Sequence, residues 1–275
     1  MTLRLGIHLP QYGRAAGPDA ITRVARAAED LGFEDVWISD HIVHPAAQSY
    51  PSPFLYDPLV TLTWAAATTT RVGLGTSVLV LPHHHPLALA NALASLDALS
   101  GGRVTVAAGT GWSEAEFDAL GQQFARRGAR TDEIIRILRA CWTEDPVDFA
   151  GEFYAVDDIR VLPQPAHPIP IWIGGSGERA YKRAAALGDG FHAIGLHEDD
   201  IGPVVERIRR DHPDPSFTFS LRTGWDPQGM EPDQIKRERD AFEAAGVQHI
   251  VSAPWRQTAD EWIRSMELLV AIVDE

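Results

Sequence analysis

The stretch IPIWIGGSGERAYKRAAAL, residues 169–187, decides the fold predicted for this chain. Its apolar run at 169–173 predicts a buried strand, the turn GGSG at 174–177 follows at once, and a helical pattern then ends at Gly188. A strand that turns through glycines into a helix leaves unpaired backbone N–H groups at the positive end of the helix dipole, which suits a phosphate. A plain tight turn with Ser176 as the helix N-cap fits the same residues. The stretch therefore predicts one β/α unit and leaves open whether its turn binds an anion.

Units of the same kind extend from this stretch in both directions. Strands are expected at 3–9, 35–39, 72–81, 103–108, 169–173, 190–194, 217–221 and 249–252, each followed by a helical pattern. The strands are apolar throughout, which is typical of a parallel sheet covered by helices. Eight evenly spaced units favour an α/β fold of the closed (β/α)8 TIM barrel type over a doubly wound open sheet. We therefore expect residues 1–275 to form a single barrel domain.

The region after the fourth strand departs from this regular alternation. Ser113 and Glu116 have the spacing of a capping box for a short helix, as Thr258 and Glu261 do for the final helix. Residues 147–165 fit no helix, and they predict an insertion after the fourth β/α unit, with two extended pieces around Gly151. A basic loop leads into the helix before this insertion, and it contains Arg126, Arg127 and Arg130.

Composition and charge exclude several classes of protein. The net charge of −14 argues against a nucleic-acid surface, and no stretch is apolar enough to span a membrane. The N-terminus leads directly into a strand, so no signal peptide is expected. The single cysteine, Cys141, excludes an internal disulfide. We therefore expect a cytoplasmic protein that acts on a small molecule.

Residues at the carboxyl ends of the predicted strands form one set, because those ends meet at one rim of a barrel. They are Asp40 and His41 after the second strand, 76–78 on the third, 109–112 after the fourth and 174–177 after the fifth. So many glycines indicate a ligand that approaches the backbone closely. An aromatic set is expected around the other end of that ligand, comprising Tyr12, His44, Phe54, Tyr56, Trp112, Trp225 and Trp255.

Five motifs together resemble the luciferase-like flavin-dependent family, and most of all its branch that uses the deazaflavin coenzyme F420. They are VWISDH (36–41), RVGLGTSVLVLP (71–82), HPLALANALASLDALSGGRVTVAAGTGW (85–112), RGARTDEIIRIL (127–138) and the IPIWIGGSGERA run. This resemblance covers most of the chain up to about residue 195 and fits the last third only in outline. It implies an oxidoreductase that moves a hydride between the deazaflavin and a small organic substrate, and it implies a homodimer.

The resemblance also assigns roles to residues of this chain. The third strand would carry a non-prolyl cis peptide between Ser77 and Val78 that supports the cofactor ring from behind. Asp40 would lie beside the polar edge of the ring, and His41 would exchange a proton at the reacting face. The remaining cofactor contacts would be Thr76, Gly109, Thr110 and Gly111, with Gly174, Gly175, Ser176 and Gly177 around the phosphate. A purely structural role, ordering the turn after the second strand, is the alternative for both Asp40 and His41.

Two departures from the family pattern bear on the substrate. Relatives that oxidise a sugar phosphate have a glutamate at the position of Trp112, and an acid after the first strand where this chain has Gln11 and Tyr12. An indole cannot act as an acid or base. We therefore expect an apolar or aromatic substrate in a pocket formed by Tyr12, His44, Phe54 and Trp112.

Three other functions fit parts of the sequence. An FMN-dependent monooxygenase, supplied by a separate flavin reductase, would use the same phosphate turn. A metal-dependent hydrolase would need ligands from Asp40, His41, His44 and the histidines at 83–85, but consecutive histidines on an extended segment cannot all point one way. We therefore expect no metal. A non-catalytic cofactor carrier would keep the phosphate turn but need no proton donor.

The same sequence suggests where copies of the chain meet and which loops cover the site. The alanine-rich helices expected at 59–67 and 86–99 have small side chains that allow close packing between two copies. The segments 44–56 and 147–165 are the expected lids over the substrate.

Overall fold

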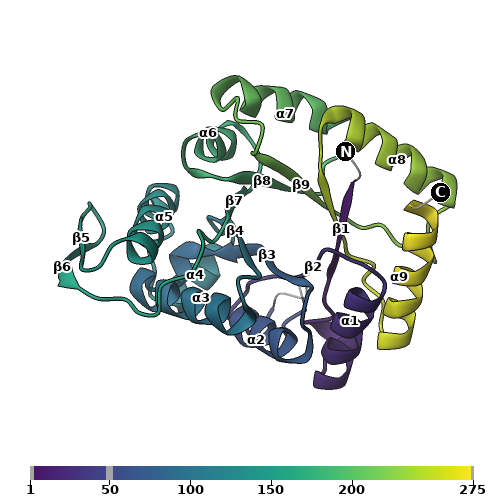
Figure 1. Cartoon of the computed structure of the whole chain (residues 1–275), viewed down its shortest axis with the longest axis horizontal. Helices are drawn as coiled ribbons and strands as arrows, with labels where there is room; N and C mark the ends of the chain where they lie inside the picture. The colour runs from purple at the N-terminus through teal and green to yellow at the C-terminus, as the bar shows by residue number, and fades with distance from the viewer. Residues whose placement is uncertain (1–2, 48–51, 274–275) are drawn as a thin grey trace.

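A computed structural model of the chain describes residues 3–47 and 52–273. Its core is a closed barrel of parallel strands with helices around the outside, which confirms the predicted (β/α)8 fold (Figure 1). Around the barrel the strands follow the order β1-β10-β9-β8-β7-β4-β3-β2. They are β1 (Arg4–His8), β2 (Asp35–Ile38), β3 (Gly73–Val80), β4 (Val104–Gly109), β7 (Ile171–Gly174), β8 (Gly190–Ile194), β9 (Thr218–Thr223) and β10 (His249–Ser252).

The helices pack their apolar faces on the barrel. In α1, for example, Pro18 occupies the first helical turn, and Ile21, Val24, Ala25 and Ala28 are buried on one face. The helices are α1 (Pro18–Asp30), α2 (Pro58–Thr68), α3 (Pro86–Ser100), α4 (Glu114–Ala119), α5 (Arg127–Thr143), α6 (Glu178–Leu187), α7 (Glu198–Asp211), α8 (Pro232–Ala245) and α9 (Ala259–Val273). The α9 capping box is confirmed, because Thr258 and Glu261 exchange hydrogen bonds between side chain and backbone.

The insertion after the fourth unit is an antiparallel hairpin of β5 (Val147–Ala150) and β6 (Ala155–Ile159), as predicted. It projects beyond α5 at the edge of the molecule (Figure 1). Glu133 of α5 holds its turn, because its carboxylate accepts backbone N–H bonds from Glu152, Phe153 and Tyr154. The hairpin is therefore fixed to the helix that precedes it.

Strand β3 has the irregularity that the resemblance implies. Its register with β4 shifts between Ser77 and Leu79, so Val78 is an extra, bulged residue. The peptide bond between Ser77 and Val78 is cis, as expected.

The expectation of strands that are apolar throughout is wrong at one level of the barrel. His8, His192, Ser220 and His249 are fully or almost fully buried on four barrel strands, and Asp35 lies below them on β2. His192, Ser220, His249 and Asp35 are hydrogen-bonded to one another inside the barrel, whereas His8 is hydrogen-bonded to Ser39 and to the backbone oxygen of Leu9. They form the floor beneath the rim described next.

Candidate active site

A cavity of about 1030 Å³ opens at the carboxyl-terminal rim of the barrel. Most of the residues predicted for the site line it: Asp40, His41, Ser77, Val78, Gly109, Thr110, Gly111, Trp112, Gly174, Gly175 and Ser176. They come from the ends of β2, β3, β4 and β7 and from the segments that follow. Active sites of (β/α)8 enzymes lie at this rim. The cavity is therefore the candidate active site.

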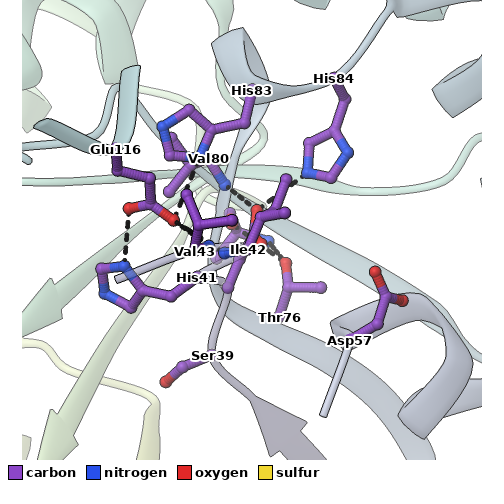
Figure 2. A network of polar contacts seen from close by, with 12 residues as sticks. Ser39, His41, Ile42, Val43, Asp57, Thr76, Val80, His83, His84 and Glu116 are labelled. Carbon is purple, nitrogen blue, oxygen red and sulfur yellow. Dashed lines mark hydrogen bonds and ion pairs between the residues drawn. The ribbon is translucent and has the colours of Figure 1, made fainter. Parts of the chain in front are cut away.

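His41 is held in place by Glu116, a residue to which the sequence analysis gave only a capping role. The Nδ1 atom of His41 lies 2.9 Å from Oε2 of Glu116, and the other carboxylate oxygen accepts the backbone N–H of Ile42 at 2.7 Å (Figure 2). Because a carboxylate only accepts hydrogen bonds, this contact places a proton on Nδ1 of His41. In the neutral ring, Nε2 is then the nitrogen with a free lone pair.

The carboxylate of Glu116 is almost completely buried, with 1% of its side chain exposed. Burial, the strongest influence, acts to raise the pKa of Glu116, but the hydrogen bonds from His41 and the Ile42 N–H together outweigh it and lower that pKa. Glu116 is therefore ionised at neutral pH. A buried carboxylate that holds the imidazole of a rim histidine is a common way to orient a catalytic base.

The capping box predicted at α4 is half right. Ser113 accepts the backbone N–H of Glu116 at 3.3 Å, as expected. The carboxylate of Glu116 does not return to the N–H of Ser113, because it binds His41 and the backbone N–H groups of Ile42 and Val43 instead. The S-x-x-E spacing thus pointed to Glu116, but the role it predicted for the Glu116 carboxylate, capping α4, is wrong.

Asp40 is buried beside the cavity, and only one of its two carboxylate oxygens is hydrogen-bonded to the residues described. Its Oδ2 accepts the backbone N–H of Val80 at 2.8 Å and lies 2.9 Å from Nε2 of His84. Burial, the strongest single influence, acts to lower the pKa of His84, but the hydrogen bond with Asp40 and the charges of Asp40 and Asp57 together outweigh it and raise that pKa. Among the residues described, Oδ1 of Asp40 has no hydrogen-bond partner. A buried acceptor atom without a donor fits a ligand that brings an N–H or O–H group to it.

The three consecutive histidines point in different directions, as the sequence analysis expected. His83 is buried against Phe117 at 4.5 Å between ring centres, His84 binds Asp40, and His85 lies 6.1 Å from the ring of Tyr154. Burial is the main cause of the lowered pKa of His83. Within residues 3–47 and 52–273 no group of three or more His, Cys, Asp or Glu side chains has the arrangement of a metal site.

Two of the rim glycines also make room for Val78, a role that was not predicted from the sequence. A Cβ atom on Gly109 would lie 2.4 Å from Cγ2 of Val78, and one on Gly174 would lie 2.4 Å from Cγ1 of the same side chain. Both distances are far below van der Waals contact. Gly109 and Gly174 therefore let the bulged Val78 side chain rest between β4 and β7, where it forms part of the cavity wall.

Gly175 and Gly177 have the properties expected of an anion cradle. Both have positive φ, +125° and +83°, and a Cβ atom on Gly177 would meet nothing within 4 Å. Gly177 is the N-cap of α6 and has no side-chain cap, so Ser176 is not the N-cap, and its side chain is exposed. The first N–H groups of α6 therefore have no side-chain cap, and the preceding residues Gly175 and Ser176 line the cavity. This arrangement suits a phosphate.

A chain of buried hydrogen bonds supports the bulge from below. Ser77 Oγ lies 2.7 Å from Nε2 of His192, whose Nδ1 lies 2.8 Å from Oγ of Ser220; Ser220 in turn meets Nδ1 of His249. His249 ends the chain at Asp35, 3.0 Å from Oδ1. Since Asp35 only accepts, the donors run from Ser77 down to Asp35.

Arg222 secures the same bulge from another strand. Its Nη1 donates to the backbone oxygen of Ser77 at 2.6 Å and to Oγ of Ser39 at 3.0 Å. Arg222 and this polar layer were not predicted, because single polar residues inside apolar runs form no recognisable sequence motif.

The aromatic side of the rim is partly as predicted. Trp112 is 59% exposed and lines the cavity, with its ring 5.7 Å from that of His41. His44 lies 5.1 Å from His41, and burial followed by the charge of His41 lowers its pKa. Phe54 is largely exposed next to Tyr56, and Tyr12 packs on Trp255. Residues 48–51 of the expected lid 44–56 lie outside the described residues.

Two of the expected contacts are wrong. Trp225 is fully buried away from the cavity, because its ring packs on Phe242 and its Nε1 binds Glu238. Thr76 is also fully buried, and it does not line the cavity. Its hydroxyl is hydrogen-bonded to the backbone of Ala107 on β4.

These features fit a phosphorylated ring cofactor. Oδ1 of Asp40 is an acceptor without a donor among the described residues, and the Val78 side chain forms an apolar part of the cavity wall. The start of α6 offers an anion site, and the imidazole of His41 is held in a fixed orientation. A (β/α)8 barrel with this rim belongs to the cofactor-binding enzymes of the fold.

Comparison with known families narrows this class. Residues 3–260 match the family model described as luciferase-like monooxygenase. The chain therefore belongs to the luciferase-like family, which confirms the resemblance seen in its motifs. It is 31% identical to an F420-dependent glucose-6-phosphate dehydrogenase of Kineococcus radiotolerans, over 91% of this chain and 80% of the relative. A protein of the same name from Intrasporangium calvum is 32% identical over 82% of this chain and 67% of the relative.

Solved structures share the fold. A monooxygenase of Streptomyces bottropensis superposes with a TM-score of 0.82 at 21% identity, over 98% of both chains. An F420-dependent secondary alcohol dehydrogenase in complex with an F420–acetone adduct superposes with a TM-score of 0.80 at 21% identity, over the full length of both chains. At this identity the likeness establishes the barrel architecture.

Proposed function

We propose that this chain is an F420-dependent oxidoreductase that transfers a hydride between the deazaflavin coenzyme and a small organic substrate. The observation that carries the proposal is the pairing of His41 with the buried Glu116 at one end of a cavity whose other end is a glycine cradle. The names of the relatives support the choice of coenzyme.

The residues that would hold the coenzyme follow from the shape of the cavity. The bulged Val78 and the backbone of Gly109, Thr110 and Gly111 would bound its ring, and Oδ1 of Asp40 would accept a hydrogen bond from the ring's polar edge. Gly175, Ser176 and Gly177 would receive the phosphate at the start of α6. When bound, the deazaflavin supplies two-electron hydride chemistry.

His41 would move the proton that accompanies the hydride. Its Nδ1 proton is held by Glu116, and Nε2 has no protein partner among the described residues. In an oxidation, Nε2 takes the proton that the substrate hydroxyl loses as the hydride leaves carbon; in a reduction it returns that proton. The charge of Glu116 stabilises the imidazolium in either direction. Asp40 would act here through the cofactor and His84.

The substrate side of the cavity favours an apolar or aromatic molecule. The exposed indole of Trp112 lies beside His41, where relatives that act on a sugar phosphate are expected to have an acid. Tyr12, His44 and Phe54 are proposed to extend this surface; none of the three lines the cavity itself, and His44 lies 5.1 Å from His41 between ring centres. These rings give stacking area and no carboxylate for sugar hydroxyls.

The other functions have less support. FMN fits the same cradle, but neither curated relative described above is named for FMN. A hydrolase would need a metal site, and the described residues form none. A non-catalytic carrier would have no use for the His41–Glu116 pair.

The test is turnover by the purified protein with coenzyme F420, followed by the absorbance of the oxidised deazaflavin. Secondary alcohols, aromatic alcohols and glucose 6-phosphate are offered as hydride donors, and the matching carbonyl compounds as acceptors of the reduced coenzyme. We expect turnover with apolar or aromatic members, and a loss of about 100-fold or more in kcat for His41→Ala with unchanged coenzyme affinity. Equal losses in kcat and affinity would contradict the role of His41, and turnover only with glucose 6-phosphate would contradict the substrate class.

We further propose that the protein is a cytoplasmic homodimer. Large apolar side chains are exposed on the neighbouring helices α2 and α3, namely Val60, Trp64 and Leu99. The only cysteine, Cys141, is buried and unpaired, so folding needs no oxidising compartment. No helix in residues 3–47 and 52–273 combines the length and apolarity needed to cross a bilayer. Light scattering should give twice the chain mass for the wild type and the chain mass for Leu99→Glu; a monomeric wild type would contradict the dimer.

A further inference from the structure

The interior of this barrel contains a polar layer where layers of bulky apolar side chains are usual. His192, Ser220 and His249 are buried there, on β8, β9 and β10. The ring of Trp37 is stacked on that of His192, with 4.9 Å between ring centres. Because a buried polar group costs free energy unless it is hydrogen-bonded, every group of this layer needs a partner of the right kind.

The layer joins the two mouths of the barrel. Its upper end is Ser77, which lines the candidate active site and is hydrogen-bonded to His192. Its lower end is Asp35, the first residue of β2, which contacts His249 and lines a separate cavity of about 600 Å³ at the amino-terminal ends of the strands. The proposed hydride chemistry uses none of the groups between these two ends.

The direction of the hydrogen bonds in the layer follows from Asp35. Its carboxylate can only accept, and its Oδ1 takes the N–H of Trp37 and lies 3.0 Å from Nε2 of His249. In a neutral His249 ring the proton is therefore on Nε2, and Nδ1 has the lone pair. Ser220 then donates its only hydroxyl proton to Nδ1 of His249, over 2.8 Å.

The same reasoning fixes His192 and Ser77. Since the proton of Ser220 is committed to His249, its oxygen accepts, and the ring proton of His192 lies on Nδ1, 2.8 Å from that oxygen. Burial is the main reason why the pKa of His192 lies well below its usual value, so this ring is neutral. Nε2 of His192 therefore accepts the hydroxyl proton of Ser77 over 2.7 Å.

We infer that this layer is a tautomer relay, through which Asp35 at one mouth of the barrel fixes the direction of the Ser77 hydroxyl at the other. The hydroxyl proton of Ser77 is directed into the barrel, so the Ser77 side chain offers a ligand in the cavity an acceptor and no donor. Reversal of the relay would release this proton and turn the acceptor into a donor. Ser77 is thus specific for a ligand group that carries an N–H or O–H, and the positioning residues behind it are Asp35, His249, Ser220 and His192.

The test is the tautomeric state of the buried histidine rings, read from two-bond ¹⁵N–¹H correlation spectra of the histidine-labelled protein. Spectra are recorded at about pH 8, because an imidazole with an ordinary pKa of about 6.5 is neutral there. The wild type is compared with Ser220→Ala and Asp35→Ala, and signals are assigned by their loss in His192→Asn and His249→Asn.

Two controls accompany these variants. Ser265→Ala removes an equally buried hydroxyl, but Ser265 lies on α9 and is hydrogen-bonded to Asp226 and Gln228 outside the layer. His8 is the internal reference, because its Nδ1 lies 2.8 Å from the backbone oxygen of Leu9, which can only accept. The ring proton of His8 should remain on Nδ1 in every variant.

In the wild type we expect the ring proton on Nδ1 of His192 and on Nε2 of His249. Ser220→Ala removes the acceptor for Nδ1 of His192, so its proton should move to Nε2, where Ser77 accepts it, while His249 is unchanged. Asp35→Ala removes the acceptor for Nε2 of His249, so the proton should move on both rings. Ser265→Ala should change neither ring.

A wild type with the proton on Nε2 of His192, or with both nitrogens of His249 protonated, would contradict the relay. The same holds if Ser220→Ala leaves His192 as it is. If Asp35→Ala does not fold, Ser220→Ala still decides, because it only deletes one hydroxyl group.

Binding of coenzyme F420, measured by deazaflavin fluorescence, tests the effect on the cavity, and this second measurement rests on the proposed function. We expect Ser220→Ala to weaken binding about 3- to 10-fold, roughly the worth of one hydrogen bond, and to have no further effect in a Ser77→Ala background. Unchanged affinity, or the same loss in both backgrounds, would contradict action through Ser77. No binding by the wild type would contradict the proposed function, and the tautomers would still decide the relay.

Discussion

His41 and Glu116 are 75 positions apart in the sequence, yet Nδ1 of one lies 2.9 Å from Oε2 of the other. The contact joins the end of β2 to the short helix α4 across the rim of the barrel (Figure 2). It decides which nitrogen of His41 is available to a substrate. The catalytic proposal therefore depends on a residue that acts through His41.

Removing the charge of Glu116 tests this dependence. In Glu116→Gln, the amide can still accept the N–H of Ile42, but its NH₂ group then donates to Nδ1 of His41 and moves the imidazole proton to Nε2. We expect kcat to fall about 10- to 100-fold, with coenzyme affinity within about twofold of the wild type. Steady-state kinetics and a coenzyme titration measure the two effects separately.

Glu114→Gln is the matched control, because Glu114 is exposed on the same helix. It should leave kcat unchanged. If Glu116→Gln turned over as fast as Glu114→Gln, Glu116 would have no part in orienting His41.

The packing of Val78 between two glycines gives a second prediction. Gly174→Ala places a methyl group where Cγ1 of Val78 now lies, so we expect it to lower the free energy of unfolding by roughly 1–3 kcal/mol and to push Val78 into the cavity. Val78→Ala in the same chain should restore most of that stability. Urea unfolding of the two single variants and the double variant gives the coupling between the sites. Additive losses would show that Val78 does not occupy the space over Gly174.

Buried histidines predict how stability depends on pH. Burial, with a smaller contribution from Arg222, lowers the pKa of His8 to about 3 and that of His192 well below its usual value. Both rings are neutral in the folded protein and take up a proton in the unfolded chain below pH 6.5. Their contribution to stability is therefore complete above pH 6.5 and is lost as the pH falls below it, by up to about 1.4 kcal/mol per pH unit for each ring.

Urea unfolding between pH 5.0 and 6.5 measures this slope. His192→Asn should reduce the slope, whatever its effect on stability at pH 7.5. Replacing the exposed His167 by Asn should leave the slope as it is in the wild type. A slope unchanged by His192→Asn would mean that this ring does not stay neutral in the folded protein.

The fold was predictable from the sequence because its signals are local and repeated. Apolar runs followed by helical patterns recur eight times, and the barrel strands and most of the rim residues follow from them. The cis peptide at Ser77 and the family itself were predictable from motifs, which carry information that periodicity does not.

The parts that were missed depend on contacts between distant segments. Glu116 looked like a capping residue because its partner His41 comes from another unit, and Trp225 looked like a pocket residue because nothing local places it against Phe242. Gly109 and Gly174 suggested only the close approach of a ligand, but the space that their missing side chains leave also receives a side chain from β3. In each case the neighbour that decides the role is fixed only when the barrel closes.

The most direct test of the account is calorimetric titration of the wild-type protein with oxidised coenzyme F420 and, separately, with FMN. The cavity, with its orphan acceptor at Asp40 and its cradle at Gly177, and the coenzyme for which the relatives are named together predict a dissociation constant for F420 in the micromolar range or below, and at least about tenfold weaker binding of FMN. Micromolar binding of FMN with no binding of the deazaflavin would contradict the account.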